Sequence, residues 1–161
     1  MVRRNERGFS LVEIVVALGL LAFVLISIAG LFIIGGKQIK SGRTSSEAMA
    51  LAREIHEEMN AWGYTQLWSV FGYNGQAATY TVDTRTNAAC TAWQTTLGTK
   101  LGTAAYADIK LDSVANAAGT TNNFADAGGN ILAKTVRVSV TVHWTEVPGR
   151  ARTVTVGTTK N

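Results

Sequence analysis

The sequence has few of the residues that build cross-linked frameworks or catalytic sites. Its 161 residues include one cysteine, Cys90, so the chain cannot form an intramolecular disulfide. We expect Cys90 to be a small apolar residue rather than a reactive thiol. No Walker-type glycine loop, His-Glu-x-x-His, Gly-x-Ser-x-Gly or paired-cysteine motif is present, and the two histidines fall in separate predicted elements. The sequence therefore predicts no enzyme, no cofactor and no metal site.

Charge is missing from one long stretch, Ile14 to Gly36, in which Ser27 is the only polar side chain. At about 1.5 Å per helical residue, this stretch is long enough to cross a hydrocarbon core of roughly 30 Å. Three arginines precede it within residues 1–8. The net charge of +4 is small and the basic residues are scattered, so we expect a membrane partner and no nucleic acid.

A basic segment followed by an apolar run has three interpretations. A secretory signal peptide would be cleaved near Ala29, before Gly30, but its apolar region should be about 7–15 residues, and this run is longer. An uncleaved leader would make the run a simple membrane anchor. A leader of the third kind is cut on the N-terminal side of the apolar segment.

The residues at that N-terminal side favour the third interpretation. Gly8-Phe9-Ser10-Leu11-Val12-Glu13, followed by the apolar run, resembles the processing site of type IV pilins and type II secretion pseudopilins. The resemblance covers roughly residues 3–36. It implies that the prepilin peptidase cleaves between Gly8 and Phe9 on the cytoplasmic face and N-methylates the new Phe9 amine. It also implies an inner-membrane protein with a single span, whose residues 37–161 lie in the periplasm before assembly.

Glu13 is the one acidic residue at the entrance of the apolar run. A carboxylate at this place is costly unless it is paired, so it is a candidate functional residue. Cleavage at Gly8 creates an amine four residues before Glu13, on the same helical face. The resemblance implies instead that the amine of one subunit neutralises Glu13 of its neighbour in a filament. A solvated, inert Glu13 in the headgroup region is the alternative.

Beyond the apolar run, apolar residues recur at spacings of three and four, which predicts a helix with one apolar face. Thr44 and Glu47 fit a capping box that would start a separate helix. We favour one helix from about Ser10 to Ala61, with Gly63 as its stop signal. The apolar face is expected to comprise Ala48, Leu51, Ala52, Ile55, Met59 and Trp62, and the opposite, solvated face Glu47, Arg53, Glu54, Glu57 and Glu58. His56 is expected at the surface.

The C-terminal part shows the period of a β-hairpin. Apolar and polar residues alternate from Val136 to Trp144, a proline and a glycine at 148–149 indicate a turn, and residues 152–156 return as the partner strand. His143 falls on the polar face and is expected to be exposed. A short strand is predicted at Thr79–Val82. Two strands alone are marginal, so at least one more from the central region, where alternation is weak, must join the hairpin.

These patterns predict an α+β fold: a long N-terminal helix packed on a small antiparallel sheet. The expected segments are a leader (1–8), a membrane or filament-core helix (9–36), its amphipathic continuation (37–62) and a periplasmic head (63–161). An aromatic group just past the helix is expected to close the core over the helix end, rather than to bind a glycan or partner; it comprises Trp62, Trp68, Phe71 and Tyr73.

The leading functional hypothesis is a minor pilin-like subunit of a type IV pilus. The resemblance implies as partners the prepilin peptidase, other major and minor pilins or pseudopilins, and an inner-membrane assembly platform. Residues 48–59 also resemble minor pilins of the PilV type. Major pilins often close the head with a disulfide, which this chain cannot form. The alternatives are a minor pseudopilin of type II secretion and a membrane-anchored periplasmic binding module.

Overall fold

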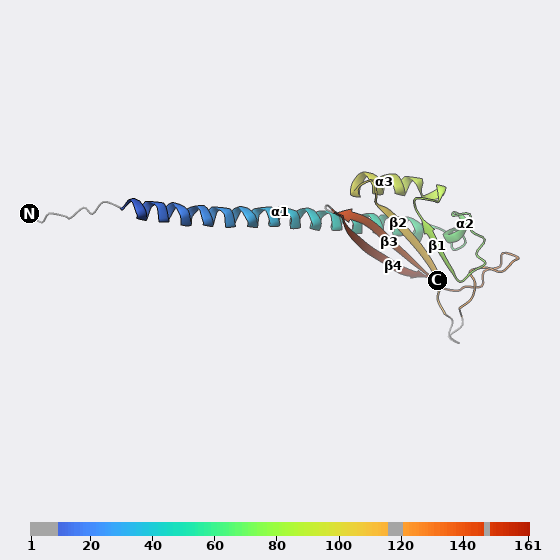
Figure 1. Cartoon of the computed structure of the whole chain (residues 1–161). Coiled ribbons are helices and arrows are strands. Elements are labelled where there is room, and N and C mark those ends of the chain that lie inside the picture. The colour runs from blue at the N-terminus through green and yellow to red at the C-terminus, as the bar shows by residue number, and fades with distance from the viewer. Residues whose placement is uncertain (1–9, 116–120, 147–148) are drawn as a thin grey trace, which may run out of the picture. The chain divides into compact units, whose positions relative to one another are not determined.

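The computed structural model describes residues 10–115, 121–146 and 149–161 (Figure 1). It divides into two compact units, residues 1–42 and 43–161. The fold is α+β, as predicted. The described elements are α1 (Leu11–Ala61), α2 (Gln66–Ser69), β1 (Thr79–Asp83), the 3-10 helix η1 (Ala88–Cys90), α3 (Thr91–Leu101), β2 (Tyr106–Ser113), β3 (Val136–Glu146) and β4 (Arg150–Lys160).

Helix α1 is continuous, which confirms the single helix favoured from the sequence. Its first turn is closed by the backbone N–H of Ile14, which donates to Ser10 O at 3.1 Å. The capping box predicted at Thr44 and Glu47 does not start a second helix, since both residues lie inside α1. Glu47 instead forms an i,i+4 ion pair of 3.0 Å with Arg43. The helix ends at Ala61, two residues before Gly63.

The sheet is a four-stranded antiparallel meander in the order β1-β2-β3-β4. The predicted hairpin is confirmed and is longer than expected, because β3 and β4 pair from Val136↔Lys160 to Glu146↔Arg150. Strand β1 confirms the short strand predicted at 79–82. Strand β2 was not predicted, although Ala107, Ile109 and Leu111 alternate there with polar residues.

The core lies between the inner face of this sheet and the second half of α1. Five residues of α1 are buried in it, all of them on the predicted apolar face: Ala48, Leu51, Ala52, Ile55 and Met59. The inner side chains of β3 are 0–4 % exposed. The buried residues of α1 and β3 belong to one hydrophobic cluster, so burial of apolar surface joins the helix to the sheet.

Aromatic residues close this core past the end of α1, as the sequence predicted. Trp68 and Phe71 are buried, while Trp62 and Tyr73 pack against the cluster from its margin. Trp68 stacks on Phe124, with ring centroids 5.2 Å apart. Gly75 lets the chain pass over the indole: its φ is +77°, and a Cβ there would lie 2.9 Å from Trp68 Nε1. This packing leaves no open aromatic platform at Trp68.

Helix α3 was also missed, because its sequence TAWQTTLGTKL is rich in threonine and has weak helix propensity. Three threonine hydroxyls donate to the carbonyl four residues earlier, those of Thr95, Thr96 and Thr99. Leu97 and Leu101 anchor the helix in the core. Trp93 Nε1 donates to Glu58 Oε2 at 2.7 Å, so Glu58, expected to be only solvated, also ties α3 to α1.

Cys90 is the last residue of η1, directly before α3, and is fully buried. Burial raises the pKa of its thiol to about 11, so it stays protonated at neutral pH. The expectation of a small apolar residue is therefore confirmed.

Candidate functional site

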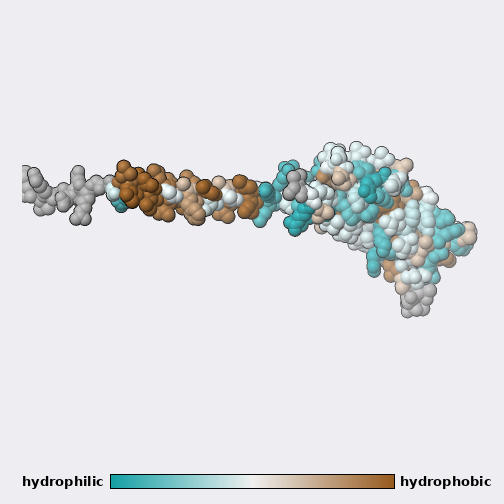
Figure 2. All heavy atoms as spheres, in the orientation of Figure 1, coloured by the Kyte–Doolittle hydropathy of each residue, from teal (hydrophilic) through white to brown (hydrophobic). Residues whose placement is uncertain are grey.

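The first unit exposes apolar surface along the whole N-terminal half of α1. Every Val, Ile, Leu and Phe from Leu11 to Ile39 is exposed, from 44 % at Ile28 to 78 % at Leu11. Figure 2 shows brown, hydrophobic surface along the first half of the helix, with paler patches between the brown ones. By length and composition α1 is a candidate membrane span, and none of its most apolar window is buried. Water is an unfavourable solvent for such a surface, so lipid or other helices must cover it.

Within the charge-free run that follows Glu13, the polar groups are satisfied inside the helix. The Ser27 hydroxyl donates to Phe23 O at 2.9 Å, so the only polar side chain of the run needs no outside partner. Backbone groups of a helix pair internally, which is the condition for a segment that enters hydrocarbon. The segment is therefore chemically suited to a bilayer and to a bundle of similar helices.

Glu13 stands in the first turn of α1, directly before the charge-free run. The backbone N–H groups of a first turn have no partner within the helix, and the helix dipole favours a negative charge there. No cation among the described residues forms an ion pair with Glu13. The predicted cleavage and methylation residues, Gly8 and Phe9, lie outside the described residues, so their geometry stays a prediction.

Residues 3–29 match a family model described as a prokaryotic N-terminal methylation motif. The chain carries the sequence signature of a type IV pilin-like or pseudopilin subunit. The match spans the basic leader, Gly8, Phe9, Glu13 and most of the apolar run. The motif implies processing by prepilin peptidase and assembly with other pilins, and it agrees with a helix that anchors the chain in a membrane. Neither a curated protein nor a solved structure matches the chain significantly.

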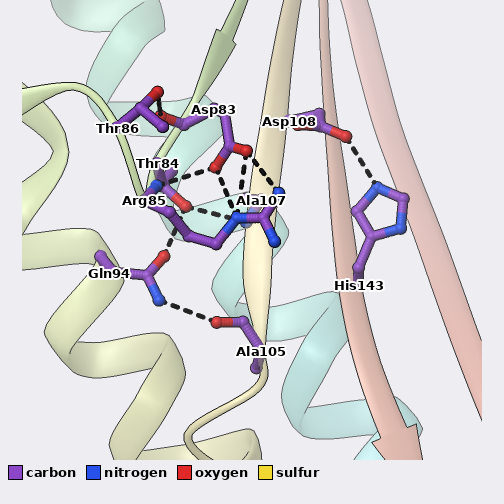
Figure 3. Close-up of polar contacts among 9 residues, drawn as sticks. All are labelled: Asp83, Thr84, Arg85, Thr86, Gln94, Ala105, Ala107, Asp108 and His143. Carbon is purple, nitrogen blue, oxygen red and sulfur yellow. Dashed lines mark hydrogen bonds and ion pairs between the residues drawn. The ribbon is translucent and has the colours of Figure 1, made fainter.

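The head carries a group of interacting charged and polar side chains at one end of the sheet (Figure 3). Arg85 binds Asp83 through two nitrogens, with Nε 3.0 Å from Oδ1 and Nη2 2.5 Å from Oδ2. The hydrogen-bonded guanidinium holds the pKa of Asp83 below its usual value, and the carboxylate raises the pKa of Arg85. The guanidinium carbon lies 3.6 Å from the ring centroid of Tyr106, a cation–π contact.

His143 is not simply exposed, and that expectation was wrong. Its ring stacks on Tyr106 with centroids 4.6 Å apart, and Nε2 lies 3.0 Å from Asp108 Oδ2. The side chain is 26 % exposed. The alternation in β3 correctly predicted that His143 lies on the outer face of the sheet. Tyr106, which is paired with His143 on the neighbouring strand β2, covers much of the imidazole ring.

His56 was also expected at the surface and is instead partly buried, with Nε2 enclosed and without a hydrogen-bond partner among the described residues. Its position between the apolar and acidic faces of α1 explains the difference, because residues at such a boundary are covered by whatever packs beside the helix.

A buried hydroxyl joins the same end of the sheet to α3 (Figure 3). Thr84 Oγ1 donates to Gln94 Oε1 at 2.6 Å and accepts from Ala107 N at 2.9 Å. Gln94 Nε2 donates in turn to Ala105 O at 2.8 Å. These contacts give the Thr84 hydroxyl both a donor and an acceptor, and they fix α3 against the strands.

Proposed function

We propose that the chain is a minor pilin-like structural subunit of a type IV pilus and that it has no catalytic role. The observation that carries this proposal is the exposed first half of α1, which is charge-free after Glu13 and begins within a methylation motif. Such a helix needs a bilayer or a helical bundle around it. The membrane provides the bilayer before assembly. A filament with a core of N-terminal helices then provides the helical bundle.

The proposed sequence of events follows from the two environments. The chain is inserted in the inner membrane with its head in the periplasm, and prepilin peptidase removes residues 1–8. The assembly platform then transfers α1 from lipid to the filament, where neighbouring helices replace the acyl chains. The hydrophobic effect does not distinguish lipid from helix, so close packing and charge pairing at Glu13 must favour the filament.

A minor rather than a major subunit is supported by the head. Its single cysteine is buried, so no disulfide loop closes the C-terminal region. The resemblance of residues 48–59 to PilV-type minor pilins points the same way. A minor pseudopilin of type II secretion shares these features, and the two roles are separated by where the chain is found.

The proposal is tested by shearing surface filaments from the native host and measuring the chain in them by quantitative mass spectrometry. We expect it in the filaments at a small fraction of the major pilin, and confined to the membrane when the major pilin is deleted. If it is absent from sheared filaments and its deletion blocks protein secretion, the pilus role is wrong and the pseudopilin role is correct.

A further inference from the structure

The free edge of β4 is a long row of unpaired backbone groups. β4 is the last strand of the sheet and pairs with β3 along all of its 11 residues (Figure 1). Among the described residues, none outside β3 makes a backbone hydrogen bond to β4. An exposed edge of this kind is a template for another strand, and proteins usually guard it with short strands, prolines, bulges or charges. Between Thr153 and Thr159, β4 has no charge, no proline and no break in register.

The hydrophobic core is incomplete on the same side. Val140 and Val142 of β3 are 0 % exposed, but the residues opposite them on β4, Val156 and Val154, are only partly buried. An additional strand beside β4 would cover these two side chains. Such burial is favourable because it removes apolar surface from water.

The opposite edge of the sheet differs. β1 has five residues, and the chain directly after it is bound to α3 through the hydrogen bond between Thr84 and Gln94. Val82 on its inner face is 3 % exposed. The core is therefore closed at β1, and the unfinished side is the one at β4.

The charges of β4 indicate what kind of strand fits there. Its sequence, RARTVTVGTTK, carries three cations at its ends and no acidic residue. Glu146 pairs with Arg152 at 3.2 Å, and Lys160 donates to Asn60 O at 2.8 Å. A second copy would bring the same cations against these ends in either strand direction, because an antiparallel copy sets Arg150 near Lys160 and a parallel copy repeats each charge. Like charges placed side by side on paired strands are unfavourable.

We propose that β4 binds an extended segment of a different protein, which adds a fifth strand to the sheet and carries acidic residues at its ends. Main-chain hydrogen bonds to β4 supply the affinity in this mode of recognition, and alternating side chains of the added strand supply the specificity. The apolar side chains of that strand cover Val154 and Val156. The surface lies wholly in the second unit, so it is present whether or not residues 1–8 are removed.

The test uses the full-length chain in the native host, with a benzophenone amino acid at Thr155 of β4. The matched control carries the same probe at Thr81 of β1; both threonines are exposed on the outer face of the sheet. We expect a photo-crosslink from Thr155 to a different protein and none from Thr81. Mass spectrometry should place the crosslinked residue within an alternating segment flanked by Asp or Glu. The variant Arg150→Gln should lower the crosslink yield about two- to five-fold, as expected for an exposed ion pair.

Other outcomes overturn the proposal. A crosslink between two copies of the chain identifies β4 as a self-association edge. Equal crosslinks from Thr155 and Thr81, or a partner segment without acidic residues, show unspecific contact. A probe at Thr153, exposed on the same face, guards against local misfolding at Thr155. No crosslink from either β4 position means that the edge is unoccupied.

Discussion

Replacing Glu13 with alanine should lower the amount of the chain in sheared filaments by more than about ten-fold while leaving its membrane level unchanged. Glu13 is the one acidic residue at the entrance of the apolar run and stands four residues after the predicted new N-terminus at Phe9. Without it, the cationic amine of a neighbouring subunit enters the filament core unpaired, at a cost of at least about 2.5 kcal/mol for a charge in hydrocarbon. Quantitative mass spectrometry of filament and membrane fractions measures the ratio.

Two controls separate this effect from general damage. Glu54→Ala removes an exposed carboxylate from the second unit and should enter filaments normally. The thermal unfolding of the head should be the same in Glu13→Ala as in the original chain, because Glu13 lies in the other unit. Normal incorporation of Glu13→Ala would show that the carboxylate is inert and solvated.

Replacing Phe124 with alanine should lower the free energy of unfolding of the head by about 3–5 kcal/mol, the usual cost of truncating a buried aromatic side chain. Phe124 is 0 % exposed and stacks on Trp68 at 5.2 Å. Its backbone N–H donates to Ala77 O at 3.0 Å, so the segment is also held by the main chain and cannot collapse freely into the cavity. Urea unfolding of the purified full-length chain in detergent, followed by tryptophan fluorescence, measures the loss.

The matched control is Ile131→Ala, from the same region of the chain. Ile131 is 49 % exposed, so its truncation should cost less than about 1 kcal/mol. Equal losses for the two variants would mean that the stacked pair of Trp68 and Phe124 is not a centre of the core.

The parts of the fold that the sequence predicted correctly are those whose pattern is long and regular. The apolar run fixes the first half of α1, and the spacing of Ala48, Leu51, Ala52 and Ile55 fixes its buried face. The alternation of five apolar residues in β3 predicted both the strand and its inner face. In each case one local period determines the element without help from the rest of the chain.

The missed elements depend on tertiary contacts. α3 has few strong helix formers and is held by Leu97, Leu101 and the bond from Trp93 to Glu58, which joins residues 35 apart in the sequence. β2 has the right alternation, but its apolar positions include the small residue Ala107, so the signal was weak. Propensity is a weak guide where packing decides.

The candidate functional residues also fall into those that a local sequence pattern predicted and those that depend on contacts between strands. Glu13 was found from sequence because an isolated charge beside an apolar run is conspicuous, and its place in the first turn of α1 agrees with the expected role. The surroundings of His143 were not predicted, because Tyr106 and Asp108 reach it from another strand. The open edge of β4 depends on strand order, which one sequence does not reveal.

In the proposed role, the apolar half of α1 packs inside a filament only after residues 1–8 have been removed. The most direct measurement is the N-terminus of the chain recovered from the host's membranes and filaments, by intact mass and N-terminal peptide mass spectrometry. We predict a chain that begins with N-methylated Phe9. A chain that begins at Met1 would contradict the account and indicate a simple membrane anchor, and one that begins near Gly30 would indicate a secreted domain.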